Sequence, residues 1–164
     1  HVRVFPLLHG GSQEAEVRAG TENLPGTVAF VKALRLLHED HKQKVNHLRR
    51  MRTILWEGLM LRDYCKINSP EDGAPHIINF SIPGYKPEVI IHALGEEGIF
   101  ISTKSACSSK QPDVSAVLKA CNLDYERTTS ALRVSLSTTN EKDEIDLFLK
   151  KLDQTVENLQ ATMG

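Results

Sequence analysis

Residues 76–101, HIINFSIPGYKPEVIIHALGEEGIFI, decide the fold class of this chain. Over the first seven positions apolar and polar residues alternate, with Ile78, Phe80 and Ile82 on one side. This alternation predicts a strand with one buried face, which the following Pro-Gly pair ends. A sheet is therefore expected to begin near residue 76.

A helix and a second strand are expected in the rest of the same stretch. Pro87 suits the first turn of a helix, and Gly95 is expected to stop it. The apolar stripe of this helix is formed by Val89, Ile90, Ala93 and Leu94. Residues 99–101 predict a short apolar strand.

Three more elements are expected toward the C-terminus. Pro112 is expected to start a short helix that carries Val114, Val117 and Leu118. Leu132, Val134 and Leu136 predict a strand face. Thr138 and Glu141 fit a capping box before an amphipathic helix. The stripe of that helix contains Ile145, Phe148, Leu149, Leu152, Val156 and Leu159. From about residue 74 the pattern is β-α-β-α-β-α, a small α+β domain.

Loops and long helices are predicted upstream of this domain. Asn23 is a candidate N-cap, with Pro25 in the first turn, and residues 29–60 favour two helices that meet near residues 38–40. One stripe of the second helix is apolar: Val45, Leu48, Met51, Leu55 and Leu59. Its other face is basic: Lys42, Lys44, Arg49, Arg50 and Arg52. A solvated face is the simpler interpretation, with a docking surface as the alternative.

The composition favours a globular protein and argues against several other classes. The chain has 164 residues, of which 40% are hydrophobic, so a globular core is expected. Its 20 basic and 21 acidic residues argue against non-specific nucleic-acid binding, and its apolar runs are too short to span a membrane. Three widely spaced cysteines favour a reducing, cytoplasmic compartment over a disulfide framework. Because the chain begins with His1, we expect a fragment of a longer protein.

Cys107 is the main candidate for chemistry. It lies among small polar residues between Lys104 and Lys110. Nearby cations lower the pKa of a thiol, and a thiolate is the form that acts as a nucleophile or redox centre. Free cysteines are more often small core residues, as expected here for Cys65 and Cys121.

Arg133 and the glycine-rich N-terminal loops are further candidates. Alternation places Arg133 opposite the Leu-Val-Leu face, either facing solvent or as a bidentate clamp for a substrate carboxylate. Residues 9–14 and 18–23 are plain turns or a phosphate cradle before a helix. They contain no P-loop motif, and the histidines show no metal spacing, so no zinc site is expected.

Four segments in order resemble one family. They are PLLHGGSQE (residues 6–14), RAGTEN (18–23), SACSS (105–109) and LRVSL (132–136). Together they resemble the NifS/IscS-like cysteine desulfurases of the class V aminotransferase group. This resemblance implies an α/β chain from a fold-type I pyridoxal-phosphate (PLP) enzyme. Residues 1–36 would end the large PLP domain, 37–73 would form the connecting helix and loop, and 74–164 would form the small C-terminal α+β domain.

The resemblance also implies roles for individual residues. Cys107 matches the cysteine that takes sulfur from L-cysteine as a persulfide, and Arg133 matches the arginine that binds the substrate carboxylate. Thr21 matches the threonine that reaches the PLP phosphate of the partner subunit, and Arg18 belongs to the same loop. The implied protein is a homodimer that makes L-alanine and passes sulfur to an acceptor protein for iron–sulfur cluster assembly or tRNA thiolation.

Two departures from the family pattern stand out. Lys104 replaces the usual glycine before Ser-Ala-Cys, and no Ser-x-His-Lys motif supplies a Schiff-base lysine. The 164-residue chain alone is therefore expected to be inactive. A selenocysteine lyase, an aminotransferase of the same group and a non-catalytic sulfur-relay module remain alternatives.

Overall fold

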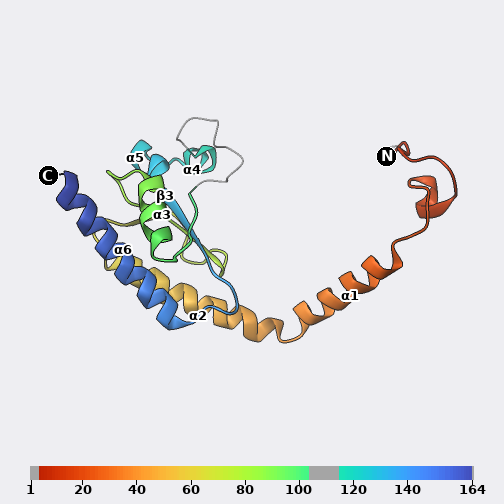
Figure 1. Cartoon of the computed structure of the whole chain (residues 1–164), viewed down its shortest axis with the longest axis horizontal. Helices are drawn as coiled ribbons and strands as arrows, with labels where there is room; N and C mark the ends of the chain where they lie inside the picture. The colour runs from red at the N-terminus through yellow and green to blue at the C-terminus, as the bar shows by residue number, and fades with distance from the viewer. Residues whose placement is uncertain (1–3, 104–114, 164) are drawn as a thin grey trace. The chain divides into compact units, whose positions relative to one another are not determined.

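The computed structural model describes residues 4–103 and 115–163 (Figure 1). The chain divides into two compact units, His1–His41 and Lys42–Gly164. None of the helices in the described residues is long and apolar enough to cross a membrane.

The first unit contains one short and one regular helix. The 3-10 helix η1 spans Gln13–Glu16, and α1 spans Leu24–His38. Asn23 Oδ1 accepts from the N–H of Gly26 at 3.0 Å, so the predicted N-cap is confirmed. The predicted break near residues 38–40 is also confirmed, because α1 ends at His38 and Asp40 adopts a φ of 58°.

The second unit is built on an antiparallel sheet in the order β1-β2-β3. The strands are β1 (Lys66–Ile67), β2 (Ile77–Ser81) and β3 (Ala131–Ser135). In the register of β2 and β3, Ile78 pairs with Val134, Asn79 with Arg133 and Phe80 with Leu132. Alternation along both strands thus puts the apolar core residues on one face, as predicted, and the polar residues on the other face, together with Ile77 and Ala131.

Three helices cover the apolar face of the sheet: α2 (His41–Met60), α3 (Pro87–Glu96) and α6 (Lys142–Met163) (Figure 1). Leu55 and Leu59 of α2 are at most 1% exposed, and Leu152 of α6 is fully buried. The predicted apolar stripes of α2 and α6 are confirmed. Their burial supplies the main stabilisation of this unit.

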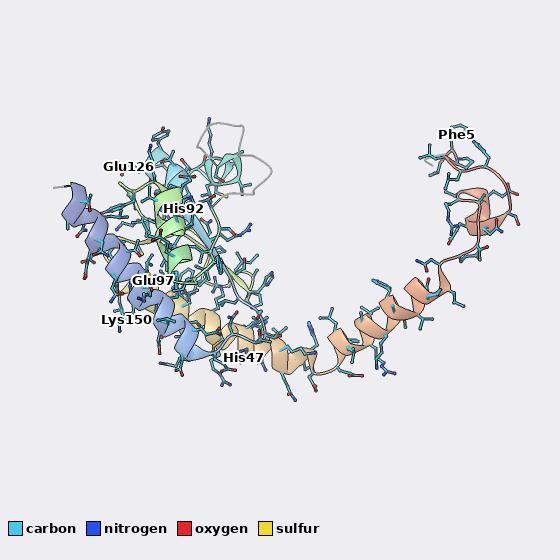
Figure 2. The ribbon with its side chains drawn as sticks, in the orientation of Figure 1. Phe5, His47, His92, Glu97, Glu126 and Lys150 are labelled. Carbon is cyan, nitrogen blue, oxygen red and sulfur yellow. The ribbon has the colours of Figure 1, made fainter. Side chains whose placement is uncertain are left out.

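Polar contacts join the same helices near their ends, and Figure 2 labels two of the residues involved, His47 and Glu97. His47 Nε2 of α2 donates to the carbonyl of Asn140, just before α6, at 2.8 Å. Glu97, which follows α3, forms an ion pair of 2.7 Å with Lys151 of α6. These contacts fix the ends of α2 and α3 against α6.

Two short helices, α4 (Ala116–Ala120) and α5 (Tyr125–Thr129), precede β3. Ser115 Oγ caps α4 by accepting from the N–H of Leu118. The helix therefore begins later than predicted, while Pro112 and Val114 lie outside the described residues.

Several predictions about helix and strand ends are wrong. Gly95 lies inside α3, and the chain turns after the helix, where Gly98 adopts a φ of 74° that favours glycine. Residues 99–101 form no strand, and only the next residue, Ser102, bridges to β3. The cap of α6 also differs from the predicted box, because Glu144 reaches back to the N–H of Glu141 at 2.8 Å.

Two side chains have an environment opposite to the predicted one. Arg52 is only 7% exposed, because its guanidinium donates to the carbonyls of Pro70 and Glu71 and lies over the ring of Trp56. It therefore does not belong to a solvated basic face. Cys121 ends α4 and is exposed, so it is not a core residue.

Candidate functional site

Arg133 lies at the middle of β3, on the polar face of the sheet. Asn79 of β2 lies opposite it on one side. On the other side Ser102 exchanges two backbone hydrogen bonds with Arg133, with N···O distances of 3.0 and 2.6 Å. Arg133 is therefore held from both sides, and its side chain projects from the face opposite the core.

The guanidinium of Arg133 retains an unused donor. The side chain is half-buried, and its Nε atom is buried with no hydrogen-bond partner among the described residues. A buried donor left unpaired costs free energy, so it calls for a partner such as an ordered water, an ion or a ligand. This environment fits a carboxylate, which accepts two parallel hydrogen bonds from arginine.

A polar network lies beside Arg133 on the same part of the sheet. Arg127 Nε donates to Asn68 Oδ1 at 2.9 Å, and Asn68 Nδ2 donates to Asn79 Oδ1 at 2.8 Å. Ser81 Oγ accepts from Asn68 Nδ2 and donates to the carbonyl of Arg127. The network makes this face of the sheet rigid and directs its polar groups.

A cleft of about 630 Å³ opens next to this network. Asn79 and Ala131 line it from the sheet, together with residues of α4 and α5 and the start of α3. Thr103 and Ser115 also line the cleft. These are the described residues on either side of the stretch that contains Cys107 in the sequence.

Of the two cysteines that bear on the chemistry, the structure describes only Cys65. Cys107, with Lys104 and Lys110, lies outside the described residues. Cys65 is buried, and burial raises the pKa of its thiol to about 12, so it remains protonated and unreactive.

Arg18 and Thr21 lie in the loop before α1, in the first unit. Arg18 Nη1 donates to the carbonyl of Gly20 at 2.8 Å, and the carbonyls of Ala19 and Thr21 accept from it at longer distances. Arg18 also pairs with Glu14 at 3.5 Å. The arginine therefore shapes its own loop, while Thr21 lies exposed shortly before the N-terminus of α1.

Sequence reasoning missed Asn68, Asn79 and Arg127. Asn79 lies on the predicted polar side of β2, which was the one available signal. Its position opposite Arg133 depends on strand register, and the bond between Asn68 and Arg127 joins residues that are 59 positions apart.

Comparison with protein families identifies one match. The family described as aminotransferase class-V matches residues 7–148. This range covers most of both units and includes every residue discussed above as a site.

Individual relatives match over nearly the whole chain. A NifS/IcsS protein homolog of Lactobacillus delbrueckii subsp. bulgaricus is 37% identical and is matched over 92% of this chain and 40% of its own length. The cysteine desulfurase IscS of Methanosarcina thermophila is 34% identical, over 97% of this chain and 40% of its own length.

Solved structures support the same fold. A NifS-like protein has a TM-score of 0.79 and 30% identity, over 95% of this chain and 40% of that protein. The chain thus spans about 40% of the length of the relatives it matches.

Proposed function

Because this chain belongs to the class-V aminotransferase family, we propose that it is the C-terminal part of a PLP-dependent cysteine desulfurase. The enzyme converts L-cysteine to L-alanine and keeps the sulfur as a persulfide on Cys107. The observation that carries the proposal is the buried Nε of Arg133, which has no partner among the described residues, on the sheet face whose Asn79 lines a cleft together with Thr103 and Ser115.

Each residue has a defined task in this proposal. Arg133 binds the carboxylate of L-cysteine and so orients its thiol. Cys107, flanked by two lysines, provides the thiolate that attacks the substrate sulfur. When bound, PLP supplies the electron sink that allows the carbon–sulfur bond to break. The Schiff-base lysine comes from a part of the protein outside these 164 residues.

The loop before α1 fits the phosphate end of PLP. The exposed Thr21 precedes the N-terminus of α1, where backbone N–H groups and the helix dipole favour an anion. Arg18 keeps this loop in shape through its backbone contacts and adds positive charge. In a homodimer, Thr21 and Arg18 would serve the PLP of the partner subunit.

The proposal includes the wider setting of the enzyme. Residues 1–36 are the end of the large domain, residues 37–73 are the helix and loop that connect the two domains, and residues 74–164 form the small domain. The persulfide passes to an acceptor protein, for iron–sulfur cluster assembly or tRNA thiolation. The widely spaced cysteines favour a cytoplasmic location.

The test uses the full-length protein that contains this chain. Loaded with PLP and given L-cysteine, it is expected to release equal amounts of L-alanine and sulfide in the presence of a thiol reductant. Cys107→Ser is expected to bind PLP normally and to lose at least 100-fold in turnover, because no thiolate accepts the sulfur.

Other outcomes identify the alternatives. Full activity of Cys107→Ser would contradict the proposed role of the thiol. Activity with L-selenocysteine alone would indicate a selenocysteine lyase, and transfer of an amino group to a keto acid would indicate an aminotransferase. Failure to bind PLP would favour a non-catalytic relay module.

A further inference from the structure

The polar face of the sheet holds a second side chain that suits the carboxylate of a substrate. Asn79 lies directly opposite Arg133 in the register of β2 and β3. Arg133 exchanges both of its backbone hydrogen bonds with Ser102, so its N–H and C=O point away from β2. Asn79 and Arg133 are thus a non-hydrogen-bonded pair, in which opposite side chains lie especially close.

The orientation of the Asn79 amide follows from a chain of donors. Arg127 Nε can only donate, so the group facing it at 2.9 Å is the Oδ1 of Asn68. The other end of that amide, Asn68 Nδ2, must then donate, and it does so to Asn79 Oδ1 at 2.8 Å. Since the two ends of an amide point apart, Asn79 Nδ2 is directed away from Asn68.

Two donors therefore come from opposite positions of β2 and β3, and the described residues offer neither of them an acceptor. Among the described residues nothing accepts from Asn79 Nδ2 or from the buried Nε of Arg133. Asn79 also lines the cleft. Arg133 itself does not line the cleft, but it lies opposite Asn79 in the sheet. Two neighbouring donors, one of them at a cleft wall, are suited to a ligand that offers two or more oxygens.

We propose that Asn79 is a second substrate-binding residue, whose Nδ2 donates to the same carboxylate that Arg133 binds. The inference rests on the proposed function. Arg133 supplies the charge and a forked donor, while the Asn79 amide adds a donor of fixed direction. Asn68 and Arg127 act as positioning residues, because they hold the amide in the orientation that presents its N–H groups.

The test measures carboxylate recognition in the full-length, PLP-loaded protein. Asn79→Ala removes the donor and is expected to raise the KM for L-cysteine about tenfold, with a smaller change in kcat. The inhibition constant of L-alanine is expected to rise by a similar factor. That of cysteamine, which has no carboxylate, is expected to stay unchanged.

Matched variants separate the possible outcomes. Ser135→Ala, an exposed residue of β3 on the same face, is expected to behave like the wild type. An unchanged KM for Asn79→Ala, or an equal loss with cysteamine, overturns the inference while leaving the proposed function intact. If Arg133→Ala also leaves the KM unchanged, or the wild type does not turn over L-cysteine, the inference and the proposed function are both wrong.

Two further variants are tested. The first separates loss of the donor from loss of folding, and the second tests whether Arg127 positions the amide. Asn79→Asp keeps the acceptor for Asn68 but sets an anion beside the substrate carboxylate, so a still larger rise in KM is expected. Arg127→Lys keeps the charge but removes the Nε donor that orients Asn68. Its effect on KM is expected to be smaller than that of Asn79→Ala and to vanish when the two are combined, whereas additive effects would remove Arg127 from this role.

Discussion

At the scale of the residue, the three thiols should differ in reactivity. Cys65 is buried with a pKa of about 12, while Cys121 is exposed at the end of α4. We expect iodoacetamide to label Cys107 first, because its flanking lysines favour the thiolate, then Cys121, and Cys65 only after unfolding. Mass spectrometry of a time course measures the order. Labelling of Cys65 in the folded protein ahead of Cys107 would contradict both the burial and the assignment of the nucleophile.

At the scale of the element, one carboxylate ties α6 to the segment after α2. Asp153 accepts from Arg62 at 2.7 and 2.6 Å and from Tyr64 at 2.5 Å. Burial opposes its charged form, but these donors outweigh burial and lower the pKa of Asp153. Asp153→Ala is expected to reduce the free energy of unfolding by about 1–2 kcal/mol, a value discounted because the carboxylate is 38% exposed.

The contribution of the Asp153 contacts to the free energy of unfolding is expected to fall at acid pH. Since the folded pKa of Asp153 lies below its unfolded value of about 3.9, its contribution is complete above that pH and is lost as the pH falls below it. Urea titrations at neutral pH and near pH 3 measure the difference, which should shrink in Asp153→Ala. Asp146→Ala removes an exposed partner of Lys142 on the same helix and serves as the control, with little loss expected.

At the scale of the whole molecule, the two units differ in what stabilises them. Every member of the hydrophobic core lies between Met51 and Val156, and α1 has no buried residue. A 15-residue helix without packing is marginal in water. Deleting residues 1–41 is therefore expected to leave the Tm of the rest nearly unchanged. Calorimetry of both lengths tests this, and a fall of more than about 5 °C would show that the first unit contributes to the core.

Activity is also expected to depend on the whole protein rather than on this chain alone. The chain as it stands contains no Ser-x-His-Lys motif, so the purified 164-residue protein is expected to release no sulfide from L-cysteine. An assay with added PLP checks this, using the full-length protein as the positive control. Turnover by the short chain would require a different lysine and would refute the proposal that the Schiff-base lysine lies outside these 164 residues.

The sequence by itself determined the elements whose burial repeats with a regular period. Ile78 and Phe80 alternate with polar neighbours, and the stripe from Ile145 to Val156 recurs every three or four residues, so local spacing predicts which side is buried. The motif around Arg133 likewise predicted its place opposite the core. Short elements were less predictable, because the five residues of α4 carry too little periodicity to show that Cys121 is exposed.

Only the tertiary structure decided which polar groups meet. Arg52 is buried because the carbonyls of a distant loop accept from it and Trp56 covers its charge. Asn79 faces Arg133 because of strand register, and a shift of one residue would turn it toward the core. Such contacts join residues far apart in the sequence and depend on geometry that no local pattern encodes, so the pair of donors beside the cleft could be found only in the folded protein.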